Sequence, residues 1–89
     1  SLDYSVGQIV YATCGREAGR LFAVVGVDGD YLWLADGRHR TLDRPKRKKM
    51  KHVRYAGDGG ETLRQLLRSG ATPRDAGLRR VLKQAAGNL

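Results

Sequence analysis

Residues 8–35 read QIVYATCGREAGRLFAVVGVDGDYLWLA, a series of short apolar segments separated by glycine and aspartate. Segments 8–14, 20–27 and 31–35 are rich in Val, Ile, Leu and aromatic residues, a composition typical of strands. Asp28-Gly29-Asp30 and Asp36-Gly37 favour hairpin turns, because glycine accepts a positive φ at little cost. These residues therefore predict three strands in an antiparallel meander.

Two further strands are expected at 38–42 and 51–55. The residues between them, 44–50, are predicted to form an exposed connection, since Pro45 cannot donate to a ladder and its neighbours are like charges. Five short strands with no helix between them indicate a mainly β fold, a small curled antiparallel barrel. Alternation assigns seven residues to its interior: Val10, Ala12, Cys14, Phe22, Val24, Leu32 and Leu34.

The hydrophobic period becomes helical after Ala56. Leu63, Leu66 and Leu67 follow helical spacing, with Gly70 as the end of that helix. A second helix is expected to begin at Thr72-Pro73 and to carry a stripe of Leu78, Val81, Leu82 and Ala85. We therefore divide the chain into a barrel over residues 1–56 and a helical hairpin over 57–89 that packs on it.

Tyr11, Tyr31 and Trp33 are predicted to project from the outer face of the barrel. They could supply the apolar surface that the helices cover, and this packing is the interpretation that we favour. The alternative is that they stack on the bases of single-stranded RNA.

An 89-residue chain that is 40% hydrophobic and 29% charged is expected to form one small soluble globular domain. Its longest strongly apolar stretch, residues 21–27, is too short for a bilayer, so we expect no transmembrane or signal segment and a cytoplasmic protein. A single cysteine excludes an internal disulfide framework. We further expect a monomer.

Charge is concentrated in residues 38–54, RHRTLDRPKRKKMKHVR, which hold nine Lys or Arg residues and one acid. The other residues carry equal numbers of acids and bases, so the net charge of +8 resides in this stretch, which we call the basic segment. Such a local positive field favours a polyphosphate backbone as partner. A solvated charge run or a localisation signal is the simpler alternative.

Residues 6–54 resemble the KOW domain, and within it the short ribosomal-protein-like KOW proteins of bacteria. The motif begins with GQIVYA at 7–12, turns through GREAGR at 15–20, with Gly19 at the place of the family's glycine, and continues into 21–27. ADGR at 35–38 followed by RPKRKKMKHV at 44–53 is similar to the end of the same barrel. The resemblance implies an SH3-like barrel that binds RNA, most often structured ribosomal RNA, with ribosomal proteins as possible further partners.

Three loops of such a barrel can converge on a phosphate ridge, with long side chains on phosphates and glycines allowing close approach. The candidate RNA-binding residues are Arg16, Gly19, Arg20, Arg38, Arg40, Arg44, Lys46, Arg47, Lys48, Lys49, Lys51 and His52.

Catalysis is not expected, because His39 and His52 lack the sequence context of a nucleophile or carboxylate partner. One cysteine and two distant histidines are too few ligands for a metal site, so none is expected. No cofactor is expected either, because the sequence contains no glycine-rich phosphate-binding loop. Two alternatives stay open. The helices could form a helix-turn-helix with basic residues Arg74, Arg79, Arg80 and Lys83. The chain could also be a protein-interaction module, in which the barrel or an uncovered helical stripe binds another protein and the basic segment attracts an acidic partner.

Overall fold

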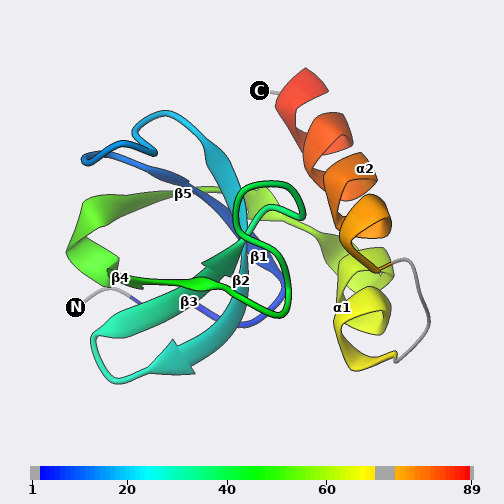
Figure 1. Ribbon diagram of the computed structural model, residues 1–89, viewed down its shortest axis with the longest axis horizontal. Helices are drawn as coiled ribbons and strands as arrows, with labels where there is room; N and C mark the ends of the chain where they lie inside the picture. Colours follow the sequence, from blue (N-terminus) through cyan, green and yellow to red (C-terminus); the bar gives the residue numbers. More distant parts are fainter. Residues whose placement is uncertain (1–2, 70–73, 89) are drawn as a thin grey trace.

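In the computed structural model, which describes residues 3–69 and 74–88, a curved antiparallel sheet of five strands lies beside two helices (Figure 1). The mainly β architecture with a helical C-terminal part is therefore as predicted. In chain order the elements are β1 (Gln8–Ala12), β2 (Leu21–Asp28), β3 (Tyr31–Ala35), β4 (Lys46–Lys49), the 3₁₀ helix η1 (Met50–His52), β5 (Val53–Asp58), α1 (Gly60–Arg68) and α2 (Arg74–Gly87).

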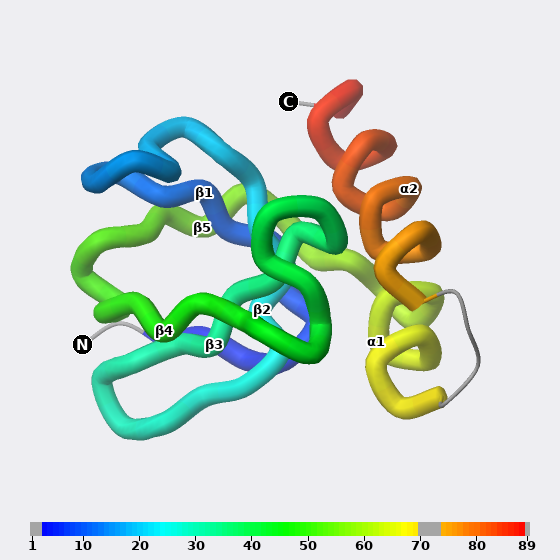
Figure 2. Tube along the Cα trace, viewed as in Figure 1, coloured from blue at the N-terminus to red at the C-terminus, as the bar shows by residue number. Residues whose placement is uncertain are grey.

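Strands β1 to β4 form a meander in which each strand pairs with the next along the chain. β5 pairs with the free side of β1, so the strand order is β4-β3-β2-β1-β5. The two outermost strands, β4 and β5, are joined by the three residues of η1. Because so short a connection spans only about 10 Å, the sheet bends until these two edges approach each other (Figure 2).

The inner face of the bent sheet carries a buried apolar cluster. Six of the seven residues predicted for the interior belong to it, as the alternation of strand side chains requires. Cys14 is the exception and is exposed, because β1 ends at Ala12 and the chain leaves the sheet before it reaches the cysteine. The cluster consists of Val10, Ala12, Phe22, Val24, Leu32, Leu34 and Val53.

A second apolar cluster joins the outer face of the sheet to the helices. The sheet contributes Ile9, Ala23 and Ala35, while the helices contribute Leu63, Leu78 and Leu82. The apolar stripe of the helices is therefore buried against the sheet. Tyr11, Tyr31 and Trp33 belong to neither cluster, so the prediction that they form the surface under the helices is wrong. Small residues such as Ala23 and Ala35 allow the helices a closer approach than aromatic rings would.

The largest difference from the predicted strands lies in the basic segment. Residues 38–42 form no strand, because the Asp36 carboxylate accepts hydrogen bonds from the backbone N–H groups of Arg38 (2.9 Å) and Arg40 (2.8 Å) and closes a compact loop. The strand is instead Lys46–Lys49, where we predicted an exposed connection. Pro45 immediately precedes it, a position where proline removes no ladder hydrogen bond.

Other boundaries differ by smaller amounts. β3 has the predicted bounds, and the Gly29 turn before it is present with φ of +58°. Residues 51 and 52, predicted to begin the fifth strand, belong to η1. α1 begins at Gly60, three residues before the first of its predicted leucines, and the described part of α2 begins at Arg74. The predicted caps at Gly70 and at Thr72-Pro73 lie outside the described residues.

Candidate nucleic-acid interface

The loop over residues 13–20 is held to the basic segment by Glu17, which is only 8% exposed. Its Oε1 accepts a hydrogen bond from Arg40 at 3.0 Å and lies 3.7 Å from Lys46 Nζ. The Arg40 hydrogen bond keeps the pKa of Glu17 below its usual value, with help from Lys46 and Lys48 and against the opposing effect of burial. Arg40 and Lys46 are thus engaged within the fold rather than free for a ligand.

The four residues of β4 divide between the two faces of the sheet. Lys46 and Lys48 stand opposite Leu34 and Leu32 and so share the inner face, where Lys48 Nζ donates to the Cys14 carbonyl at 3.0 Å. Arg47 and Lys49 lie on the outer face. The prediction of a single exposed loop of cations is therefore wrong, because strand geometry sends alternate side chains in opposite directions.

An open groove of about 840 Å³ lies between α2 and the loops that follow β1 and β3. Gly19 and Asp36 are among the residues that line it, and α2 passes beside the loop after β3 in Figure 2. Asp36 is the acid in its lining, and its Oδ1 already accepts two backbone hydrogen bonds. The positively charged lining residues are Arg20, Arg38, Arg79, Arg80 and Lys83.

Contacts between α2 and the loop after β3 hold the groove in shape. Arg79 donates to the Gly37 carbonyl, and the Leu42 N–H donates to Asp75 Oδ1 at 2.9 Å. Gly37 has a φ of +78°, and a Cβ there would collide with the Asp75 carbonyl oxygen. A glycine is therefore needed at position 37 both for its backbone conformation and for the close approach of the helix.

Gly19, the glycine of the resemblance, has a φ of +86° and donates its N–H to the Ala12 carbonyl at 2.8 Å. A Cβ at this position would meet no atom within 4 Å. The requirement for glycine is thus conformational, and the space beside it opens on the groove. Next to it, Arg20 contacts the Nδ1 atom of His39 at 3.0 Å, which links the loops on this side of the groove.

Gly19, Arg20 and Arg38 are brought together at the groove, whereas the other predicted site residues lie elsewhere. Arg16, Arg44 and Lys51 are exposed outside it, and their side chains make no hydrogen bond or ion pair with the described part of the chain. His52 is half-buried and its carbonyl accepts from Thr13.

The sequence places Arg79, Arg80 and Lys83 in the helix-turn-helix alternative and not in the predicted RNA site. Their position opposite the apolar stripe of α2 indicates that their side chains are exposed. It does not indicate which loops of the sheet lie next to them.

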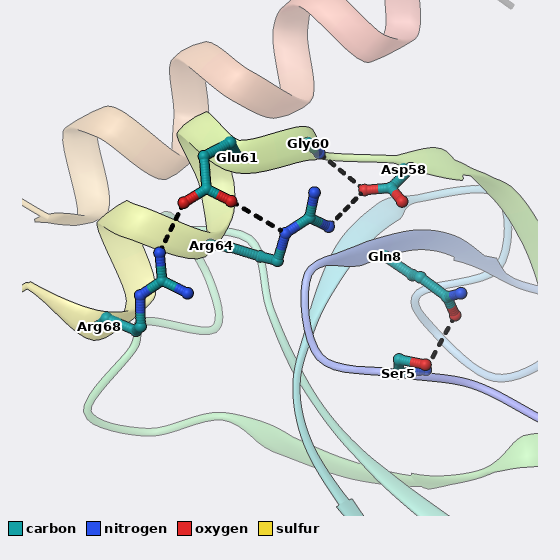
Figure 3. A network of polar contacts seen from close by, with 7 residues as sticks. All are labelled: Ser5, Gln8, Asp58, Gly60, Glu61, Arg64 and Arg68. Atoms are coloured by element: carbon teal, nitrogen blue, oxygen red, sulfur yellow. Dashed lines mark hydrogen bonds and ion pairs between the residues drawn. The ribbon is translucent and has the colours of Figure 1, made fainter.

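The acids near α1 form a separate network (Figure 3). Asp58 accepts from the Gly60 N–H at 2.7 Å and from Arg64 at 2.9 Å, while Glu61 lies 2.7 Å from Arg68 and 3.5 Å from Arg64. The pKa of Asp58 is lowered chiefly by the Gly60 hydrogen bond and that of Glu61 chiefly by Arg68. These exposed pairs leave α1 with little unbalanced charge.

Within residues 3–69 and 74–88, no three His, Cys, Asp or Glu side chains gather in a way that could hold a metal ion. The described helices include none with the length and apolar character needed to cross a bilayer.

No protein-family model matches this sequence, and a search of curated proteins finds no relative. The resemblance to the KOW domain therefore rests on the quoted motif residues alone.

Proposed function

We propose that this chain is a non-enzymatic RNA-binding module. The observation that carries the proposal is the open groove of about 840 Å³ beside α2, whose lining holds five Lys or Arg side chains and one acid that is already hydrogen-bonded. An open groove with fixed cations suits an extended polyanion better than a small molecule, which needs enclosure.

The groove lining fits a sugar-phosphate backbone in two ways. Arg38, Arg80 and Lys83 are exposed and make no polar side-chain contact with other described residues, so they can replace the counterions of phosphates. Gly19, Ala76 and Ala86 supply small surfaces between the cations, where a backbone can approach closely.

The fold supports a KOW-type, SH3-like barrel as the scaffold of this module. The motif residues 7–12 and 21–27 fall on β1 and β2, and the loop that joins them contains Gly19. The short η1 connection between the two edge strands favours closure of the bent sheet into a barrel. From the resemblance we propose structured ribosomal RNA, or a ribosomal particle in the cytoplasm, as the target.

A protein-interaction module is the less favoured alternative. Its helical form needs an uncovered apolar stripe, whereas Leu63 and Leu78 are fully buried against the sheet, so the barrel surface would have to bind the partner. Salt distinguishes the two functions, because phosphate binding weakens steeply with ionic strength and apolar docking does not.

The test compares two triple variants that remove the same charge. Arg38→Gln/Arg80→Gln/Lys83→Gln alters the groove, while Arg16→Gln/Arg44→Gln/Lys51→Gln alters exposed cations outside it. With a fluorescein-labelled RNA stem-loop, we expect the groove variant to lose about a hundredfold in affinity. Its slope of log affinity against log salt should become shallower by about two to three, from about 0.7 per phosphate on single strands to about 0.9 on a duplex.

The matched variant should lose only a few-fold, since it changes the overall field but no direct phosphate contact. Circular dichroism would verify that both variants keep the fold. Equal losses in the two variants, or an unchanged salt slope in the groove variant, would show that the groove is not the RNA site.

A further inference from the structure

Beyond the helices, the outer face of β3 and β4 carries two aromatic rings and two cations. The register places Tyr31 opposite Lys49 and Trp33 opposite Arg47. Directly paired residues of an antiparallel ladder project from the same face, so all four side chains share one surface. We call these four residues the β3–β4 patch.

The side chains of the patch contact one another. The Arg47 guanidinium carbon lies 3.7 Å from the centre of the Tyr31 ring, and Lys49 Nζ lies 5.9 Å from the same centre. Both are within the range of cation–π attraction. The ring of Tyr31 is thereby held in place beside two charges that can reach phosphate.

Trp33 is positioned by a glycine on the neighbouring strand. Gly26 pairs with Trp33, and a Cβ at Gly26 would stand 3.1 Å from Trp33 Cδ1. The indole therefore occupies the space above Gly26, where any other residue would place a side chain. A ring fixed against the sheet in this way loses little conformational freedom when a base stacks on it.

The fold itself does not account for this aromatic surface. Trp33 and Tyr31 are half-buried and belong to neither apolar cluster of the described residues, because the helices pack over Ile9, Ala23 and Ala35. The patch thus combines aromatic rings and cations on a surface that no described helix requires for packing.

We propose that the β3–β4 patch binds unpaired nucleotides of the same RNA that occupies the groove. Bases stack on Trp33 and on the face of the Tyr31 ring that Arg47 does not cover, while Arg47 and Lys49 contact the adjoining phosphates. Asp36 lines the groove three residues after Trp33, about 10 Å along the chain, so one RNA is long enough to touch both sites. The proposal rests on the proposed RNA-binding function and specifies its ligand as RNA with a single-stranded extension.

Trp33 is the only tryptophan of the chain, so tryptophan fluorescence reports on the patch alone. The full chain is titrated with a blunt RNA stem-loop and with the same stem-loop carrying a tail of about five unpaired uridines. We expect the tail to raise affinity by about tenfold and to quench Trp33, whereas the blunt stem-loop should leave the fluorescence largely unchanged.

Three variants test the stacking interaction without changing any charge. Tyr31→Leu should abolish most of the gain from the tail, and Tyr31→Phe, which keeps the ring, should restore it. Tyr55→Leu serves as the control, because Tyr55 is 57% exposed on β5 and lies outside the patch. All three should bind the blunt stem-loop as the parent does, since none alters the groove.

The outcomes distinguish this inference from the proposed function. If the tail adds no affinity and no quenching while stem-loop binding stays salt-dependent, the patch proposal is wrong and the groove stands. If the blunt stem-loop also fails to bind, the proposed function itself is wrong. Equal quenching by the blunt stem-loop would overturn the preference for unpaired nucleotides.

Discussion

The two C-terminal helices bury similar side chains but differ in how their charges are used. On α1, Arg64 and Arg68 each form an ion pair with a nearby carboxylate (Figure 3). On α2, Arg80 and Lys83 form none with the residues that the structure describes. Similar cations therefore have different availability, and the number of basic residues in a helix does not locate a binding site.

Spacing alone would not have revealed this difference. Asp75 precedes Arg79 by four residues, a separation that favours an ion pair on a helix. In the structure, Asp75 accepts from the Leu42 N–H and Arg79 donates to the Gly37 carbonyl. Both groups are taken up by the loop after β3, and this contact places the remaining cations of α2 beside the groove.

The largest expected effect is a loss of stability at the buried leucines that the two helices have in common. Leu63 of α1 and Leu78 of α2 are both fully buried in the outer cluster, so replacing either with Ala should cost about 2–5 kcal/mol through lost burial and a cavity. Urea denaturation would measure both. A cost below about 1 kcal/mol for Leu78→Ala alone would mean that polar contacts, rather than packing, hold α2 on the sheet.

A smaller loss of stability should distinguish the contact between α2 and the loop after β3 from backbone strain alone. Gly37→Ala combines a positive φ with a collision at the Asp75 carbonyl, so we expect a cost of about 3 kcal/mol and weaker RNA binding. Gly29→Ala is the matched control, because Gly29 also has a positive φ but open space around it. Strain alone should cost about 1 kcal/mol and leave RNA affinity unchanged. If the two variants lose the same free energy of unfolding, α2 can shift to relieve the collision at little cost.

Acid should weaken the ion pairs of α1. The folded state lowers the pKa values of Asp58 and Glu61 below their ordinary values of 3.8 and 4.5, so their stabilising contribution is complete at neutral pH. It is lost as the pH falls through the lowered values. Amide shifts in NMR spectra should therefore change at Gly60 on acidification, with little change at Arg80. The same midpoint at both amides would indicate that the helices respond as one unit.

The smallest expected effect is on RNA affinity when an acid that pairs with the arginines of α1 is neutralised. Glu61→Gln releases Arg68 and one contact of Arg64 and raises the net charge by one. Because α1 lies outside the groove lining, RNA affinity should change by less than about twofold. A rise in RNA affinity as large as the loss in the groove variant would show that a cation freed on α1 binds RNA as well as the cations of the groove. The distinction between the two helices would then be wrong.

Much of the sheet could be predicted because alternation is a local property. The alternating period alone predicts Val10, Phe22 and Leu34 in the interior, where they lie, and β3 has the predicted bounds. The sequence predicts a loop in place of β4, because four consecutive cations and a proline are typical of a loop. An edge strand needs only one partner, and its alternating side chains keep neighbouring charges apart.

The candidate site was less predictable for a different reason. Gly19, Arg20 and Arg38 lie in or beside turns that the sequence marks, and they reach the groove. Arg40 could not be distinguished from them, because its pairing with Glu17 joins residues 23 positions apart. The contribution of α2 likewise depends on a tertiary contact at Gly37.

The position of β4 at one edge of the sheet has a consequence for the behaviour of the protein in solution. Any part of this edge that the bent sheet leaves open can recruit a strand from another molecule and so start aggregation. Two copies pairing along Lys46–Lys49 would bring two rows of four cations to a strand spacing of about 4.8 Å, where their repulsion opposes contact. A long polyanion that neutralised these rows would remove that protection. Excess polyphosphate should therefore make the protein more prone to aggregate.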